Sequence, residues 1–305
     1  MPHQTLSKQD LKLKKIAASL SISLAITLIA LKTFALIHTE SLAIMSSMID
    51  SLADLLASII TFWAISFSCQ PADASHRYGH GKAEAISALV QAAFIIGSAL
   101  FVIYDGVLRL IYPKPIIKTD LGMLVMVISL ALSIVFICFQ NYVAKKTRSQ
   151  ALHADALHYS VDVITNISII ISLWIVQKWQ IIWFDTITAF GIAFYLLANA
   201  KNIIKDALAM LMDKELNDTI RNNIIKTAME CSHVMGIHDL RTRDSGGFYI
   251  IELHLEFDGM LTLTEVHQYT QKVENRLKQL LPDAQILIHQ DPVGINEERL
   301  DELIN

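Results

Sequence analysis

The sequence predicts a membrane all-α six-helix transmembrane bundle, followed by a small soluble α+β domain. The chain has 305 residues, 53% of them hydrophobic, and the apolar residues come in long blocks that are typical of a polytopic membrane protein. After about residue 213 these blocks end, and shorter patterns typical of a soluble domain begin. The formal net charge of −4 gives no indication of a nucleic-acid partner.

Six apolar segments are expected to span the membrane, since a crossing needs about 20 residues of α-helix. They are residues 16–37, 41–69, 82–111, 120–144, 152–177 and 181–206. The first is longer than the apolar core of a signal peptide, so we expect a retained helix. Lysine and arginine are in excess before the first span, after the second and fourth spans, and at the end of the sixth. This excess predicts that both termini lie in the cytoplasm.

The segment after the spans is expected to have the element order α-β-β-α-β. The expected elements are a helix at 215–232, strands at 236–243 and 248–257, a helix at 263–281 and a strand at 285–290. Alternation along the second strand places four apolar residues on one face: Ile251, Leu253, Leu255 and Phe257. Thr262 and Glu265 have the spacing of a capping box at the start of the second helix. The order predicts a cytoplasmic ferredoxin-like layer of helices on a sheet.

Acidic residues lie where a membrane helix should be apolar. Asp50 and Asp54 are near the middle of the second span, and such an acid costs roughly 2.5–3.5 kcal/mol on insertion scales. Their i, i+4 spacing directs both carboxylates from one face of a helix. His158 and Asp162 repeat this spacing in the fifth span. Three carboxylates and one imidazole can form a four-ligand site for a divalent cation.

The same donors also bind protons, which makes exchange of metal for protons natural at this site. Imidazole titrates near neutrality, so protons and metal compete for the lone pairs of His158, Asp54 and Asp162. A structural polar cluster, with Lys32 as partner of one acid, explains the paired spacing less well. Asp155, also on the fifth span, is expected to be an interfacial residue rather than a ligand.

Two further clusters of histidine and aspartate have the composition of metal sites. In the loop after the second span these residues are Asp73, His76 and His80, although exposed residues of these types are also common in polar loops. In the soluble domain they are His238, His254, His267, His289 and Asp291, which neighbouring strands and a helix can bring together around one or two zinc ions. The three cysteines are scattered, so a thiolate cage is not expected.

Five motifs in this order resemble the cation diffusion facilitator family, in particular its bacterial zinc- and iron-effluxing branch. They are Asp50-x-x-x-Asp54, His158-x-x-x-Asp162, PADASHRYGHGKAE at 71–84, HDLRTR at 238–243 and IHQDP at 288–292. The resemblance covers nearly the whole chain. It implies a secondary transporter, not an enzyme, that exports Zn²⁺ from the cytoplasm in exchange for protons, by alternating access in a homodimer. It also implies placement among the lipids of the bacterial cytoplasmic (inner) membrane, and leaves Fe²⁺ and Cd²⁺ open as substrates.

The resemblance also implies a division of the chain and roles for its polar clusters. The regions are a cytoplasmic N-terminal segment at 1–15, a transport domain at 16–208, a metal-binding and dimerisation domain at 209–292 and a flexible tail at 293–305. The loop cluster would hold zinc, and the cluster in the soluble domain would hold a binuclear zinc site at the dimer contact. Lys82 and Asp213 occupy the positions of a salt bridge near the hinge between membrane and cytoplasmic parts.

Two other functions remain open from the residues alone. A passive divalent-cation channel would use similar intramembrane acids without moving protons in the opposite direction. A membrane-anchored metal sensor would use the soluble cluster, but leaves the acids at mid-membrane unexplained. A membrane metalloenzyme ranks last, because no HExxH, GxSxG or other hydrolytic signature is present.

Overall fold

The computed structural model describes residues 8–39, 42–111, 120–179, 183–295 and 299–303. Some side chains within these helices, including those of Asp50 and Asp162, lie outside the described part. The chain divides into two compact units. A helical unit comprises Gln9–Leu208, and the second unit contains Ala209–Asn305.

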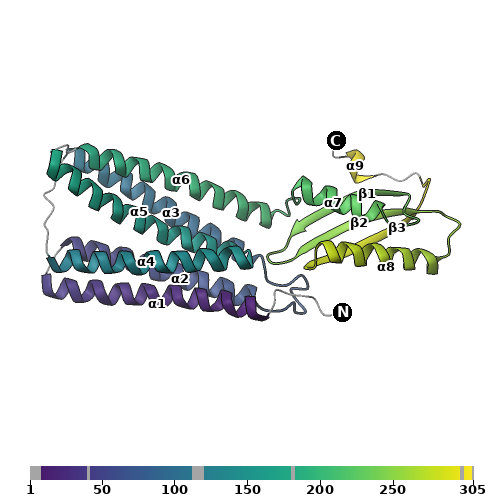
Figure 1. The fold of residues 1–305 in the computed structure, drawn as a ribbon, viewed down its shortest axis with the longest axis horizontal. Helices are drawn as coiled ribbons and strands as arrows, with labels where there is room; N and C mark the ends of the chain where they lie inside the picture. Colours follow the sequence, from purple (N-terminus) through teal and green to yellow (C-terminus); the bar gives the residue numbers. More distant parts are fainter. Residues whose placement is uncertain (1–7, 40–41, 112–119, 180–182, 296–298, 304–305) are drawn as a thin grey trace. The chain divides into compact units, whose positions relative to one another are not determined.

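The helical unit is built from six long helices (Figure 1). They are α1 (Lys8–Thr39), α2 (Leu42–Ser68), α3 (Ala83–Ile111), α4 (Asp120–Thr147), α5 (Gln150–Trp179) and α6 (Trp183–Leu211). Three described segments are long and apolar enough to cross a membrane: Gln9–His38, Ala83–Leu108 and Val127–Thr147. A shorter apolar helix covers Asp54–Ser68. The predicted helical membrane domain is confirmed.

The first helix begins earlier than the apolar pattern predicts. The lysines expected to precede the first span lie within α1, and Lys14 is only 2% exposed. Its Nζ atom is 2.7 Å from Oε1 of Glu84 at the start of α3. Lysine is a good helix former, and pairing with a carboxylate offsets part of the cost of burying its charge. This contact joins residues 70 positions apart, which periodicity within one segment does not report.

Helix α5 is central to the helical unit because it packs against α2, α3 and α4. Small residues permit the close approach of helices in membranes. On α5 they are fully buried at Ala151, Ala154 and Ala156, next to the fully buried Tyr159. The ring of Tyr159 meets that of Phe136 on α4 edge to face, with centroids 5.3 Å apart. This packing fixes which face of α5 points toward α2.

The second unit has the predicted order α-β-β-α-β (Figure 1). Its elements are α7 (Asp218–Met229), β1 (Gly236–Asp244), β2 (Tyr249–Phe257), α8 (Leu263–Leu280), β3 (Ala284–Pro292) and a final short α9 (Leu300–Leu303). The sheet order is β1-β2-β3, with β2 antiparallel to β1 and parallel to β3. Strand β2 is therefore the centre of the sheet.

The two faces of the sheet have different chemistry. The four apolar residues predicted to share one face of β2 are all buried, in a core with Ile224 of α7 and Val273 and Leu277 of α8. The alternate residues Glu252 and His254 are half-buried on the opposite face. The predicted alternation is confirmed, and it leaves a polar face that α8 does not cover.

The predicted capping box at the start of α8 is also confirmed. Thr262 Oγ1 accepts a hydrogen bond from the Glu265 amide, and a Glu265 side-chain oxygen accepts one from the Thr262 amide at 2.8 Å. The bond from the Thr262 side chain, followed by that from its amide, lowers the pKa of Glu265. A lowered pKa means that this contribution to stability is present above the ordinary carboxyl pKa and is lost as the pH falls through the lowered value.

Thr262→Ala is expected to destabilise the second unit by about 1 kcal/mol, because the helix loses its N-cap oxygen. Amide hydrogen exchange of the full chain would show this as faster exchange in the first turns of α8. Thr264→Ala is the matched control, since Thr264 is an exposed threonine of the same turn and not the N-cap. Equal exchange in the two variants would contradict the assigned cap.

Candidate metal sites

The helical unit brings together one acid and the histidine of the predicted intramembrane set. Nε2 of His158 on α5 is 3.0 Å from Oδ1 of Asp54 on α2, and both side chains are more than nine-tenths buried. The ring of Phe94 meets His158 edge to face, with centroids 6.1 Å apart. A carboxylate oxygen and an imidazole nitrogen in contact are two donors of the kind that a four-coordinate divalent-cation site uses.

The other two predicted ligands lie outside the described side chains. Asp50 is one turn before Asp54 on α2, and Asp162 is one turn after His158 on α5. Lys32, the alternative partner of an acid, donates from Nζ to Ser51 Oγ at 2.6 Å. The described hydrogen bond of Asp54 is instead to His158, which favours the predicted ligand pair over a structural Lys–Asp pair at this residue.

Asp155, expected from the sequence to be an interfacial residue, is enclosed by the helices of the bundle. It is completely buried, and its two oxygens accept hydrogen bonds from three other helices. Ser21 of α1 and Gln140 of α4 donate to Oδ2 at 2.8 and 2.5 Å, and Gln91 of α3 donates to Oδ1 at 3.0 Å. The sequence did contain a sign of this burial, because Gln91 and Gln140 lie within apolar spans, where their amides need hydrogen-bond partners. Which acid they meet depends on helix packing.

The hydrogen bonds around Asp155 continue into α2, the helix of Asp54. Gln91 Nε2 also donates to Thr61 Oγ1 at 2.8 Å and to the Ala57 carbonyl at 3.2 Å. Ser58 Oγ is 2.8 Å from Ser21 Oγ and 2.9 Å from the Tyr159 hydroxyl. A buried polar network therefore links α2 with α5 next to the Asp54–His158 pair.

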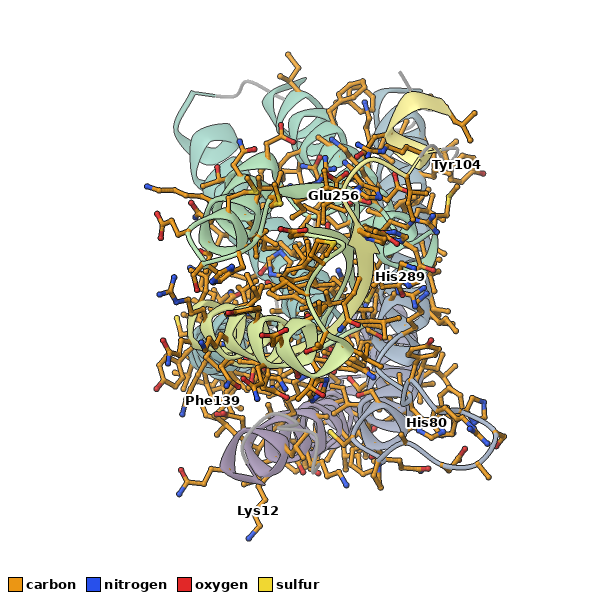
Figure 2. The ribbon with its side chains drawn as sticks, turned by 90° about the vertical axis from the view of Figure 1, so that its right-hand side faces the viewer. Lys12, His80, Tyr104, Phe139, Glu256 and His289 are labelled. Carbon is orange, nitrogen blue, oxygen red and sulfur yellow. The ribbon has the colours of Figure 1, made fainter. Side chains whose placement is uncertain are left out.

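The loop between α2 and α3 brings its three predicted ligands together. Asp73, His76 and His80 each offer one ligand atom within 4.8 Å of the others. Asp73 lies 3.4 Å from a ring nitrogen of each histidine, and the two rings are 4.5 Å apart between centroids. His80, labelled in Figure 2, is buried and packs edge to face on Phe67. Its Nδ1 atom has no hydrogen-bond partner among the described residues.

Hydrogen bonds within this loop stabilise the anionic form of the Asp73 carboxylate. The His76 amide donates to its Oδ1 at 2.6 Å, and the Ser75 hydroxyl and amide donate to the same oxygen at 2.9 and 2.8 Å. These bonds, led by that of the His76 amide, lower the pKa of Asp73 to about 2. The carboxylate is therefore ionised throughout the neutral range, and the opposite oxygen Oδ2 faces His80.

Three histidines line up across the polar face of the sheet in the second unit. His254 on β2 is in register with His238 on β1 and with His289 on β3, and adjacent rings are 5.0 and 4.7 Å apart. Asp291 lies 2.9 Å from His254, 3.1 Å from His289 and 3.5 Å from His238. In Figure 2, which looks at this unit end on, His289 lies on the side of the sheet away from α8.

Ligand atoms of His238, His254 and Asp291 lie within 4.8 Å of one another, and His289 contacts the second oxygen of Asp291. His267, the fifth predicted ligand, is exposed on α8 and is not part of this group. Helix α8 packs on the apolar face of the sheet, while the other four residues lie on the polar face. The structure therefore brings four of the five predicted residues together within one chain.

A glutamate that the sequence did not single out also contacts this cluster. Glu256 Oε1 on β2 is 3.3 Å from His238 Nδ1, while the other nitrogen of His238 faces Asp291. Arg299, within the segment expected to be a flexible tail, donates to the same Glu256 oxygen at 2.5 Å. The i, i+2 spacing of His254 and Glu256 on β2 already places both on one face.

The proposed hinge salt bridge between Lys82 and Asp213 joins residues of the two separate units, so it stays a prediction. Within the second unit, Asp213 accepts a hydrogen bond from Arg243 Nη1 at 3.2 Å. Arg243 is the last residue of the HDLRTR motif, and it also lies 3.8 Å from Glu252.

Comparison with known proteins agrees with these two units. Residues 18–212 match the model of the cation efflux transmembrane domain, and residues 216–293 match that of the cation efflux protein cytoplasmic domain. The cation-efflux pump FieF of Yersinia enterocolitica is 41% identical over 292 residues, covering 94% of this chain and 95% of that protein. The FieF pump of Shewanella oneidensis is 39% identical over 281 residues, covering 92% and 95%.

Among solved structures, the metal-bound C-terminal domain of the CzcD transporter from Thermotoga maritima is 26% identical to this chain. It covers 27% of this chain and all of that one, with a TM-score of 0.26. The family models cover both units, and the pumps align over nearly the full chain. The chain therefore belongs to the cation diffusion facilitator family, as its five motifs predict.

Proposed function

We propose that this protein exports Zn²⁺ from the bacterial cytoplasm across the inner membrane in exchange for protons, with Fe²⁺ or Cd²⁺ as further substrates. It acts by alternating access in a homodimer with both termini in the cytoplasm. The observation that carries the proposal is the buried Asp54–His158 contact between α2 and α5. Membership of a metal-efflux family and the full-length similarity to cation-efflux pumps support the direction of transport.

The transport ligands are proposed to be Asp50, Asp54, His158 and Asp162. The donor set of carboxylate oxygens and one imidazole suits zinc, ferrous iron and cadmium, without separating them. Protons on His158, Asp54 and Asp162 would displace the metal, because each ligand binds metal only in its deprotonated form. The burial of the described pair favours this over a channel, whose conducting path needs sites that ions can enter and leave freely.

The loop and cytoplasmic clusters are proposed to hold resident zinc. Asp73, His76 and His80 fit it because an ionised carboxylate and two imidazoles already converge within 4.8 Å. His238, His254, His289 and Asp291 fit it because they converge from three strands onto one polar face. His267 lies on α8, over the other face of the sheet, so the site proposed within one chain does not include it. Zinc bound there would link the strands and stabilise the dimer, which is the contribution a structural zinc makes in small domains.

Glu256→Gln is expected to weaken zinc binding at the cytoplasmic site by about 10–100-fold. Glu256 Oε1 lies 3.3 Å from Nδ1 of His238, and loss of a carboxylate beside the second nitrogen of a ligating histidine has an effect of this size. Titration of the purified full chain with zinc, followed by calorimetry, would measure it. Glu252→Gln is the matched control, because Glu252 lies on the same strand and face but beside Arg243. Equal affinities in the two variants would contradict the role of Glu256.

Proteoliposomes test the proposed function against its alternatives. Zinc, cadmium, ferrous iron and manganese are supplied in turn to purified protein, with and without an imposed proton gradient. Uptake of zinc, iron or cadmium that follows the gradient is the expected result. Metal flux indifferent to the gradient would establish a channel instead, and no flux of any metal would favour a membrane-anchored sensor.

A further inference from the structure

Asp155 is a fully buried acid of the helical unit that the proposed metal site does not use. It lies on α5 three residues before His158, so both side chains project from neighbouring positions on the same side of the helix. An ionisable residue within a membrane helix is costly and normally has a functional role. Asp155 therefore lies about one helical turn from the proposed metal site without being one of the proposed ligands.

The described hydrogen-bond partners of Asp155 are all neutral. They are Ser21 from α1, Gln91 from α3 and Gln140 from α4. The titratable groups in its electrostatic surroundings are Asp54 of α2 and His158 and Tyr159 of α5. Thus neither a lysine nor an arginine is among the described hydrogen-bond partners of this carboxylate, in contrast to the Lys14–Glu84 pair. Among the described residues, the hydrogen bonds that stabilise its charge therefore come from neutral donors.

The same partners can satisfy both charge states of Asp155. The ionised carboxylate needs donors, and three are in place. A protonated carboxyl needs one acceptor, and the Oε1 atoms of Gln91 and Gln140 are buried without a hydrogen-bond partner among the described residues. Rotation of either amide by half a turn exchanges its NH₂ group for this oxygen. A purely structural hydrogen-bond network around an ionised Asp155 would not need the two buried glutamine oxygens that have no described donor.

Electrostatic repulsion couples this residue to the metal. A divalent cation held by Asp54 and His158 would lie about one helical turn away, and it would favour the ionised carboxylate of Asp155 over the neutral, protonated form in a medium that screens charge weakly. Metal binding therefore favours ionised Asp155, and metal release favours the protonated form. The hydrogen bonds through Ser58 and Tyr159 connect the residue to both helices of the site.

We propose that Asp155 is a proton-carrying site of the exchange cycle, distinct from the metal ligands. The inference rests on the proposed metal–proton exchange and deepens it. When metal binds from the cytoplasm, the Asp155 O–H bond breaks and its proton passes to water on that side. When metal leaves on the other side, the carboxylate takes up a proton from there. One proton per cycle is thus moved in the direction opposite to the metal, in addition to any carried by the ligands.

The test compares the proton-to-zinc ratio of wild type and Asp155→Asn in proteoliposomes with the membrane potential clamped at zero. Asparagine is isosteric with the protonated acid but cannot lose a proton. The ratio is read from the pH difference that stops net zinc flux at a fixed zinc gradient, which is independent of transport rate. The expected result is a ratio lower by one proton, seen as a larger pH difference at balance, while zinc binding is retained.

Different failures overturn different claims. Wild-type flux that ignores the pH difference would overturn the proposed exchange, whereas coupled wild type with an unchanged ratio in Asp155→Asn would overturn only the role of Asp155. If Asp155→Asn does not fold, zinc-induced infrared difference spectra of wild type and Asp155→Glu replace it. Zinc is expected to remove a protonated carboxyl band whose frequency shifts in Asp155→Glu. A difference spectrum without such a shifting band would contradict the proposal.

Discussion

Asp54→Ala is expected to lower zinc transport by more than about 100-fold while the protein remains folded. Loss of a residue that only hydrogen-bonds a metal ligand already lowers metal affinity or activity by about 10–100-fold, and Asp54 is itself a proposed ligand. The substitution removes a carboxylate in contact with His158, with 3.0 Å between Oδ1 and Nε2. Zinc uptake into inverted membrane vesicles measures the effect directly. Gel filtration of the purified variant would check that the fold and oligomeric state are unchanged.

Asp206→Ala provides the matched control for this experiment. Asp206 is also an aspartate of the helical unit, but it is exposed on α6 and belongs to none of the clusters described above. Uptake by this variant is expected to equal that of wild type. If Asp54→Ala transported zinc as well as Asp206→Ala does, the intramembrane site would be wrongly assigned.

Glu84→Ala is expected to have the largest effect on stability, about 3–5 kcal/mol, because it leaves the ammonium of Lys14 buried without its carboxylate. For a unit of about 200 residues this corresponds to a fall in Tm of roughly 10 °C. Lys14 Nζ lies 2.7 Å from Glu84 Oε1, and both side chains are almost fully buried. Ser68 and Ser149 also donate to the Glu84 carboxylate. The substitution therefore removes an acceptor that both serines share with Lys14. Thermal unfolding in detergent would measure the shift.

The double variant Lys14→Met with Glu84→Gln separates charge from packing. It removes both charges together and keeps an oxygen acceptor for the two serines, so most of the lost stability should return. A double variant as unstable as Glu84→Ala would show that the ion pair is not the source of the effect.

Local patterns were sufficient to predict the second unit. Alternation along β2 correctly placed Leu253 and Leu255 in the core, and the Thr262–Glu265 spacing correctly placed the start of α8. Both signals lie within a few residues of sequence, where the period of a strand and the geometry of a cap act directly. The i, i+4 spacing likewise singled out Asp54 and His158, which the structure brings into contact across 104 residues of sequence.

Contacts made between helices could not be predicted in this way. Asp155 looked interfacial because nothing near it in sequence pairs with it, and its donors come from α1, α3 and α4. The start of α1 was placed too late for the same reason, since the burial of Lys14 depends on Glu84, 70 residues away. Glu256 was missed because its contacts to His238 and Arg299 cross from one strand to another and to the chain end.

The most direct test of the central claim is to record zinc and proton movement together in one vesicle. Purified protein is reconstituted with a pH-sensitive dye trapped inside, and zinc is added outside while its uptake and the internal pH are followed. Zinc is expected to enter as protons leave, with both signals lost in Asp54→Ala and kept in Asp206→Ala. Zinc entry with no change in internal pH in the wild-type protein would contradict it.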